Sequence, residues 1–337
     1  MLLRADRRLF LKALSSAAAF GVSGCLPDAM TVGAIAPSAV APPPGYDPVL
    51  LAVTNRGMIK GGIKSPWFGH ERSPESRVAQ VLFRRPDTSL AGRASAAWNG
   101  TWRINRVTPD DRPAREALTQ ATSGREVLLY THGYKESFES SAVTAIELSE
   151  GIGFQGQPML FSWPSRAALF DYGYDRESAL FSRDGMEEML VALLSQGGAS
   201  RVHIVAHSMG TLLTIETLRQ IWARHGDAMA SKIGAVVLAS ADIDLDLFTN
   251  AMQRLRSLVP KMTVISSASD KALEVSRRLA GGVARTGAAS REQLEGLGVR
   301  VVDATDHGGW AVIKHDLFLS DPEVRMVVSR SVERGRA

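Results

Sequence analysis

The stretch that most constrains the fold is 201–210, where a run of apolar residues ends in the sequence AHSMG at 206–210. The run 202–206 predicts a buried strand, and apolar residues at spacings of three and four after Ser208 predict a helix with one face toward a core. A chain that passes from a buried strand into a helix through small residues must turn sharply. The stretch therefore predicts a strand–bend–helix unit of a parallel α/β sheet.

Short apolar runs alternate with helical stretches along the chain from about residue 49. These runs are apolar on both faces, as expected for parallel strands that helices cover on both sides. The expected strands are 49–53, 127–130, 159–161, 202–206, 235–239, 262–266 and 299–302. This order predicts one α/β domain over 49–330 with a doubly wound, mostly parallel sheet. We expect residues 54–125 to form a β-extension at the N-terminal end of the same domain.

Residues 1–24 have the composition of a targeting segment and are kept out of the fold. The sequence DRRLFLK at 6–12 resembles a twin-arginine export signal, and a stretch rich in Ala and Ser follows it. The sequence VSGC at 22–25 resembles a lipobox, in which a lipidated cysteine becomes the new N-terminus. Cys25 is the only cysteine of the chain and is therefore the expected lipidation site. Residues 25–48, rich in Pro and Ala, are expected to form a tether.

This N-terminal segment predicts a lipoprotein of the bacterial cell envelope, held on a membrane outside the cytoplasm through lipidated Cys25. The alternative is an ordinary secretory signal or an amphipathic helix, with Cys25 incidental. Without residues 1–24 the net charge falls from +4 to about +1, so electrostatics gives no reason to expect nucleic-acid binding. A single cysteine excludes an internal disulfide and a Cys-rich metal site. We expect no metal and no cofactor, and the sequence leaves the oligomeric state open.

The bend at Ser208 fits a serine nucleophile better than a simple helix cap. The usual pattern at such an elbow is G-x-S-x-G, and Ala206 replaces the first glycine here with one extra methyl group. A hydroxyl at a helix N-terminus also lies where backbone N–H groups favour developing negative charge. Such a serine needs a histidine as base and a carboxylate that orients the histidine. In this arrangement the chain order is serine, acid, histidine.

The expected acid is Asp270, which follows a strand and so lies at the carboxyl end of the sheet, where the sites of open α/β sheets gather. Its rivals are Asp242 and Asp244, which follow the preceding strand. Two histidines, His307 and His315, come after the last expected strand, and composition does not choose between them as the base.

Two backbone N–H groups are the expected donors to the negative oxygen of a reacting ester. The expected strand 127–130 continues into Thr131-His132-Gly133-Tyr134. In an elbow-type site one donor comes from the loop after this strand, and the other belongs to the residue after the nucleophile. This assigns the N–H groups of Tyr134 and Met209.

Several short segments, taken in order, resemble a family of bacterial α/β hydrolases that are described only as esterase- or lipase-like and carry a domain of unknown function. The segments are AVTNR at 52–56, THGY at 131–134, FSWPS at 161–165, AHSMG at 206–210 and SDKAL at 269–273. The resemblance covers roughly 49–320 and implies the α/β-hydrolase fold. The family usually has Gly-His-Ser near its end. His315 occupies that position between Lys314 and Asp316, so the resemblance favours it over His307.

The sequence therefore predicts a serine hydrolase of carboxylesterase or lipase type, in which Ser208, Asp270 and His315 cleave a small-molecule or lipid ester through an acyl-enzyme. One alternative is an acyltransferase or amidase on the same fold. Another is a non-catalytic envelope lipoprotein that uses the fold for binding. The aromatic-rich segment 163–185 is a candidate cap over the site. The natural substrate and its acyl chain length cannot be read from the sequence.

Overall fold

The computed structural model describes residues 48–59, 65–86, 102–168, 171–307 and 315–337. The expected export signal, the lipidation site Cys25 and the tether therefore lie outside the described residues, apart from residue 48. Within the described ranges, none of the helices combines the length and apolar character that crossing a membrane would require.

Among the described residues, nine strands form one sheet in the order β3-β2-β1-β5-β4-β6-β7-β8-β9. From β1 to β9 the neighbouring strands run parallel, whereas β2 pairs antiparallel with β1 and β3. The strands are β1 (Val49–Met58), β2 (Phe68–Arg84), β3 (Arg103–Asp110), β4 (Glu126–Thr131), β5 (Gln157–Ser162), β6 (Arg201–His207), β7 (Ile233–Ala239), β8 (Met262–Ser266) and β9 (Arg300–Asp303). The expected doubly wound, mostly parallel sheet is confirmed.

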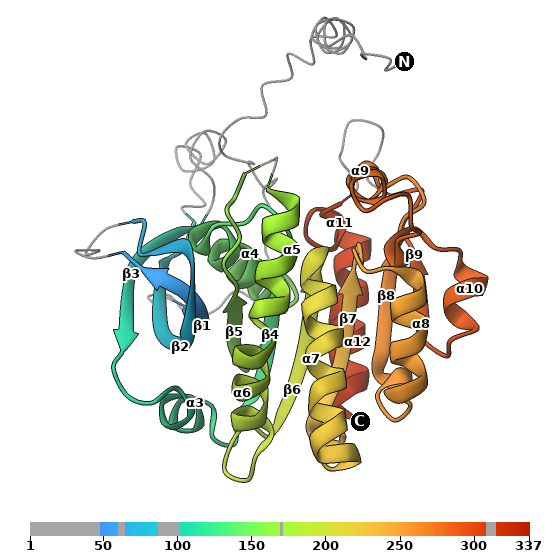
Figure 1. Cartoon of the computed structure of the whole chain (residues 1–337). Coiled ribbons are helices and arrows are strands. Elements are labelled where there is room, and N and C mark those ends of the chain that lie inside the picture. The colour runs from blue at the N-terminus through green and yellow to red at the C-terminus, as the bar shows by residue number, and fades with distance from the viewer. Residues whose placement is uncertain (1–47, 60–64, 87–101, 169–170, 308–314) are drawn as a thin grey trace, which may run out of the picture.

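Helices cover both faces of this sheet (Figure 1). They are α3 (Ala114–Thr122), α4 (Phe138–Gly151), α5 (Tyr172–Phe181), α6 (Arg183–Leu194), α7 (Met209–His225), α8 (Leu245–Arg254), α9 (Lys271–Leu279), α10 (Arg291–Glu295), α11 (Leu317–Ser320) and α12 (Pro322–Arg336). One apolar core contains residues of α3, α6, α7 and α8, and a second core on the other face contains residues of α4, α11 and α12.

The central strands of the sheet are apolar on both faces because they contribute to both cores. Along β6, Val202, Ile204 and Ala206 belong to the core under α6 and α7, whereas Val205 belongs to the core under α12. Successive side chains of a strand point to opposite faces, so a strand covered on both sides cannot alternate apolar with polar residues. All seven residues of β7 are buried for the same reason.

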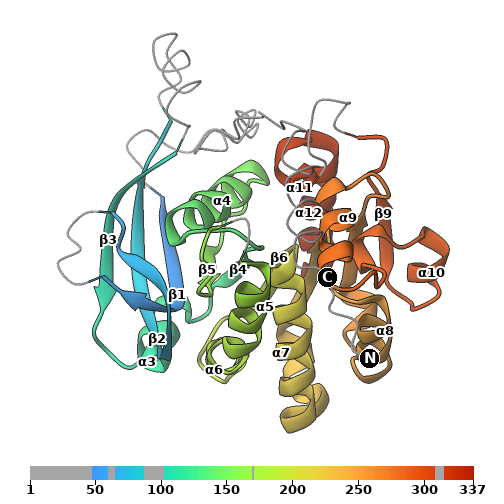
Figure 2. The same ribbon diagram turned by 45° about the horizontal axis from the view of Figure 1, so that its top comes forward.

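Residues 54–125 add β2, β3 and α3 to the same sheet as the rest of the chain. Figure 2 shows β1, β2 and β3 side by side at one edge of the sheet and β9 at the opposite edge. The strand β1 is longer than the sequence pattern indicates, because it continues through Thr54, Asn55 and Arg56, all of which are buried. The continuous apolar pattern stops at Val53, although the strand does not.

The bend after β6 brings the start of α7 against the end of β4. A Cβ atom added at Gly210 would lie 2.4 Å from the carbonyl oxygen of His132 and 2.6 Å from that of Thr131. Real Cβ atoms do not approach backbone oxygens this closely, so only glycine fits here without a shift of the helix. This close approach sets the distance between α7 and the loop that follows β4.

The substitution Gly210→Ala tests this packing. We expect it to lower the free energy of unfolding by about 1–3 kcal/mol, because the added methyl group overlaps two backbone carbonyls. The matched control is Gly173→Ala in α5, where an added Cβ meets nothing within 4 Å. The control should be neutral or up to about 1 kcal/mol more stable. Urea unfolding of both variants measures the difference, and equal stability of Gly210→Ala and wild type would contradict the packing argument.

Candidate active site

Ser208 occupies a strained backbone position at the bend between β6 and α7. Its φ is 50° and its ψ is −123°, in a region that residues with a side chain rarely adopt. The Ser208 N–H donates to the Ala239 carbonyl at 3.0 Å, and the Ser208 carbonyl accepts from the Asp242 N–H at 3.2 Å. The Ser208 side chain makes no capping hydrogen bond to α7. The hydroxyl is therefore not used as a helix cap, which was the alternative to a nucleophile.

Asp270 and His315 form a hydrogen-bonded pair although they lie 45 residues apart. His315 Nδ1 is 2.8 Å from Asp270 Oδ2. The other carboxylate oxygen, Oδ1, accepts from the N–H groups of Ala272 at 2.9 Å and Leu273 at 3.2 Å, at the start of α9. Asp270 thus caps α9 with one oxygen and contacts the histidine with the other.

Asp270 and His315 shift each other's pKa in opposite directions. Burial by itself lowers the pKa of His315, but the hydrogen bond and charge of Asp270, followed by the charges of Asp316 and Asp242, raise this pKa above its ordinary value. Burial by itself raises the pKa of Asp270, whereas the hydrogen bond and charge of His315 lower it overall. Asp270 is therefore a carboxylate at neutral pH.

Two further side chains hold the main chain of His315. Ser240 Oγ donates to the His315 carbonyl at 2.8 Å, and His207 Nε2 lies 3.2 Å from the same oxygen. The rings of His207 and His315 are 4.7 Å apart between centroids. Burial lowers the pKa of His207 to about 3, so this ring is neutral and can donate one hydrogen bond. Neither contact is predictable from the sequence, since no local pattern at Ser240 or His207 signals a contact with residue 315.

The loop after β4 lies directly against Ser208. A Cβ atom added at Gly133 would be 2.8 Å from the Cβ atom of Ser208 and 3.1 Å from His207 Nδ1. Tyr134 follows in this loop, and its hydroxyl donates to the Ala168 carbonyl at 2.9 Å. Met209 is the first residue of α7, so its N–H has no acceptor within the helix. The two expected N–H donors therefore belong to segments that flank Ser208.

The rival acids have other partners. Asp242 accepts from Ser276 Oγ at 2.5 Å and lies 3.2 Å from Arg285 Nε, both within the protein interior. Asp244 caps α8 by accepting from the N–H groups of Asp246 and Leu247.

The rival base is also engaged elsewhere. His307 Nδ1 lies 3.3 Å from Asp321 Oδ2, at the start of α12. The structure therefore brings His315 rather than His307 to Asp270.

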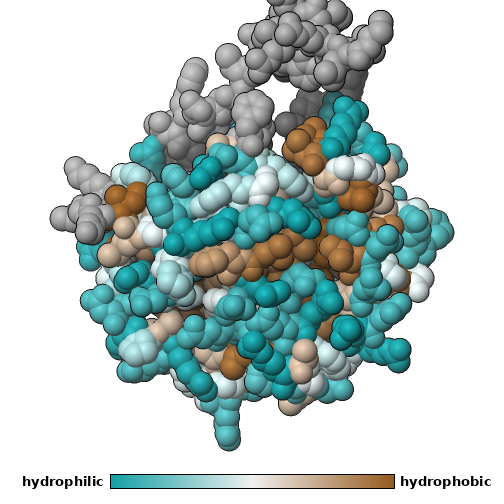
Figure 3. Space-filling view, in the orientation of Figure 1, coloured by the Kyte–Doolittle hydropathy of each residue, from teal (hydrophilic) through white to brown (hydrophobic). Residues whose placement is uncertain are grey.

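The candidate cap 163–185 contains α5 and the beginning of α6. Trp163 is fully buried and stacks on His132, so it belongs to the core rather than to an open pocket wall. The Tyr172 hydroxyl reaches Asp242 Oδ2 at 3.1 Å, and its ring packs edge-on against Tyr134. Tyr172 thus links α5 to the loop after β7, which contains Asp242, and to the loop after β4, which contains Tyr134. Figure 3 shows apolar surface gathered in a band across the middle of this face, in the region of α5 and the top of α7.

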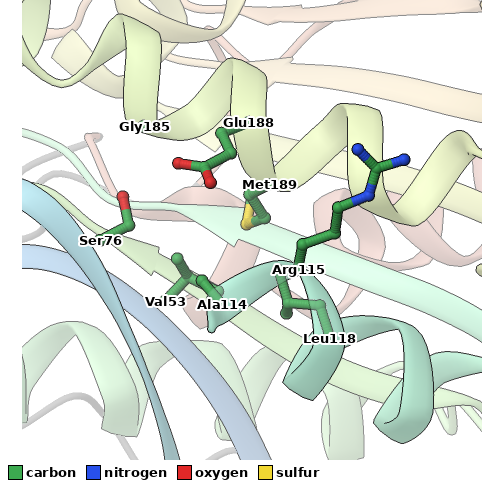
Figure 4. Close-up of a pocket in the computed structure, with 8 residues that line it drawn as sticks. All are labelled: Val53, Ser76, Ala114, Arg115, Leu118, Gly185, Glu188 and Met189. Atoms are coloured by element: carbon green, nitrogen blue, oxygen red, sulfur yellow. The ribbon is translucent and has the colours of Figure 1, made fainter. Parts of the chain in front are cut away.

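A separate recess lies between β1, β2, α3 and α6 (Figure 4). Its lining residues are Val53, Ser76, Ala114, Arg115, Leu118, Gly185, Glu188 and Met189. None of them is a member of the Ser208, Asp270 and His315 set, so this recess does not serve the candidate site. Over the described part of the chain, no group of three or more His, Cys, Asp or Glu side chains could hold a metal ion.

Comparison with solved structures returns hydrolases at low identity. An esterase from Pyrobaculum calidifontis is 14% identical over 77% of this chain and 81% of its own, with a TM-score of 0.37. A predicted CIB-like hydrolase from Thermoplasma acidophilum is 16% identical over 76% and 99%, with a TM-score of 0.38. A thermostable carboxylesterase cloned from a metagenomic library is 13% identical over 86% and 90%, with a TM-score of 0.39.

No curated protein matches the chain. Residues 110–332, in contrast, match the model of a family described as "Alpha/beta hydrolase of unknown function (DUF900)". The matched range runs from the end of β3 into α12 and includes Ser208, Asp270 and His315. Because the match covers well over half of the chain, the protein belongs to this family of α/β hydrolases.

Proposed function

We propose that this α/β hydrolase cleaves a carboxylic ester, with Ser208 as the nucleophile, His315 as the base and Asp270 as the acid that orients it. The observation that best supports the proposal is the 2.8 Å contact between Asp270 Oδ2 and His315 Nδ1. With Nδ1 engaged by the carboxylate, the other ring nitrogen, Nε2, is available to the serine hydroxyl. The strained bend supplies that hydroxyl at the end of β6 without using it as a cap.

The proposed reaction has two halves. His315 Nε2 accepts the Ser208 proton while Oγ bonds to the ester carbonyl carbon, and the carbonyl oxygen becomes negative. The imidazolium then gives this proton to the leaving alkoxide as the C–O bond breaks, which leaves an acyl-enzyme on Ser208. Water attacks the acyl carbon, again with His315 as base, and the carboxylic acid departs as Ser208 regains its proton.

Each half of the reaction passes through a tetrahedral intermediate with a negatively charged oxygen. The N–H groups of Met209 and Tyr134 are proposed to stabilise this oxygen. One such donor contributes about 3 kcal/mol to the transition state in enzymes of this type. Asp270 stays ionised throughout and stabilises the imidazolium of His315. Ser240 and His207 hold the His315 backbone, so the ring does not have to be positioned by Asp270 alone.

The proposed substrate is a small-molecule or lipid ester. The apolar band around α5 and the top of α7 supports an acyl group rather than a charged one, because apolar surface gains free energy when it covers a hydrocarbon chain. We also propose that the protein is an envelope lipoprotein whose lipidated Cys25 places it beside such substrates.

Replacing the proposed nucleophile tests the mechanism directly. We expect Ser208→Ala to lose at least about 10⁴-fold in kcat on short p-nitrophenyl esters, because the acyl-enzyme can no longer form. The same variant should not be labelled by a fluorophosphonate probe. Ser231→Ala, an exposed serine remote from the bend, is the control and should keep both activity and labelling. Full hydrolysis by Ser208→Ala would rule out the assignment.

The proposed base makes the rate depend on pH. The reactive form of His315 is neutral, and its pKa is raised above the ordinary 6.5, so kcat/KM should rise with pH through a limb whose midpoint lies above 6.5. In Asp270→Asn the amide oxygen can still cap α9, but the negative charge that raises the pKa is gone. We expect this limb to move to lower pH and kcat to fall by about 10⁴-fold.

The measurement is the pH profile of kcat/KM for both proteins between pH 5 and 9. An unshifted limb in Asp270→Asn would contradict the assignment of His315 as the titrating base. A limb that moves as expected, with kcat unchanged, would contradict the role of Asp270 in catalysis.

The proposed anchor is tested in a bacterial host that exports twin-arginine substrates. Wild type should sediment with membranes and incorporate labelled palmitate, whereas Cys25→Ala should do neither, because Cys25 is the only thiol that can carry the lipid. Ester hydrolysis by detergent-solubilised wild type and Cys25→Ala should be equal. Wild type that carries no palmitate would contradict the lipoprotein proposal while leaving the hydrolase proposal intact.

A further inference from the structure

Arg56 is a buried cation near one edge of the sheet. It belongs to β1 and is only 1% exposed. Burial lowers the pKa of Arg56 to about 10, so the guanidinium remains charged at neutral pH. A charged group is costly to bury unless hydrogen bonds compensate for the lost water. The partners of this guanidinium therefore indicate why the chain keeps a cation in its interior.

Part of the guanidinium faces the end of β5 and the neighbouring strand β2. Nε donates to Ser162 Oγ at 2.9 Å, and Nη1 donates to the carbonyl oxygens of Ser165 at 3.0 Å and Gly69 at 3.2 Å. These acceptors are uncharged and lie in different segments. The contacts therefore fix geometry between segments instead of neutralising one carboxylate.

The remaining nitrogen faces the loop after β4, the loop that lies against Ser208. Nη2 donates to the Glu136 carbonyl at 2.7 Å and lies 3.4 Å from His132 Nε2. His132 and Glu136 stand on either side of Gly133 and Tyr134. One guanidinium thus contacts both ends of the short stretch that carries a proposed N–H donor.

His132 is fixed further by the end of β5. Its ring stacks on the Trp163 ring at 4.7 Å between centroids with 11° between the planes. Trp163 Nε1 donates to the His132 carbonyl at 2.9 Å. The sequence segments AVTNR, THGY and FSWPS, which are far apart along the chain, therefore meet around Arg56.

We propose that Arg56 is a positioning residue for the proposed reaction: its guanidinium holds the loop 132–136 so that the Tyr134 N–H is presented beside Ser208. Arg56 touches no reacting atom and acts only through this loop. The inference rests on the proposed function, since it takes the Tyr134 N–H as a donor to the reacting oxygen. A lysine cannot replace Arg56 here, because one ammonium group has no planar fork with which to span several segments.

The variant Arg56→Lys keeps the positive charge and loses the planar guanidinium with its several N–H donors. We expect kcat on a short p-nitrophenyl ester to fall about 10- to 100-fold, with KM within about twofold of wild type, because the donor is misplaced in the transition state more than in the bound ester. The Ki of a trifluoromethyl ketone, whose adduct carries the same negative oxygen, should rise by the factor by which kcat/KM falls. A purely structural role would leave kcat and Ki unchanged in the folded fraction.

The matched control is Arg201→Lys. Arg201 begins β6, at the opposite end of this strand from Ser208, and its Nη1 donates to the Gly335 carbonyl at 2.7 Å. It should retain the wild-type kcat and Ki. An Arg56→Lys protein that matches this control in kcat, or that changes KM alone, would overturn the proposal.

Hydrogen exchange of the full chain gives a readout that does not depend on activity. Peptides covering 132–136 should exchange about tenfold faster in Arg56→Lys than in wild type, and at the wild-type rate in Arg201→Lys. Unchanged exchange in Arg56→Lys would overturn the proposal. If wild type is neither labelled by a fluorophosphonate nor active on esters, the proposed function fails, while the exchange experiment still decides whether Arg56 holds the loop.

A milder variant covers the case in which Arg56→Lys does not fold. Ser162→Ala removes the acceptor of Nε and leaves the cation and its other partners in place. We expect kcat to fall by about threefold, with faster exchange in the same peptides. Wild-type kcat together with wild-type exchange in Ser162→Ala would then overturn the proposal.

Discussion

The strained backbone of Ser208 is the constraint on which the rest of the site depends. A non-glycine residue at positive φ costs of order 1–3 kcal/mol and persists only where its surroundings fix it from several sides. Here β7 accepts the Ser208 N–H, the loop after β7 donates to the Ser208 carbonyl, and Gly210 and Gly133 let the bend and the stretch at the end of β4 approach to contact distance. The parallel sheet supplies all of these neighbours, because β4, β6 and β7 are adjacent parallel strands whose carboxyl ends lie side by side.

The Asp270–His315 pair shows how a site built from loops gains a defined geometry. The two carboxylate oxygens of Asp270 have different partners, since Oδ1 caps α9 and Oδ2 contacts His315 Nδ1. The His315 carbonyl is held independently by Ser240 and His207. The ring is therefore fixed from its Nδ1 side and from its backbone, which leaves few directions in which Nε2 can move.

A structural feature could be predicted from the sequence where a short stretch of residues is enough to indicate it. The buried strands and the bend at Ser208 were predictable, because apolar runs and small residues at a turn are local patterns. The bounds of β2 and β3 were not, since both strands have many exposed polar residues and are defined by pairing, β2 with β1 and β3 with β2. The choice between His307 and His315 depends on where a loop returns to the sheet. Spacing along the chain cannot decide it.

Arg56 makes directional contacts that apolar side chains could not make at this position in the fold. An apolar side chain there would avoid the cost of burying a charge, but the carbonyls of Ser165 and Glu136 and the hydroxyl of Ser162 would each lose a donor in the interior. Apolar packing holds helices against the sheet without regard to direction, whereas the loop that is proposed to present the Tyr134 N–H group needs directional contacts. The buried cation supplies them where β1, β4 and β5 end.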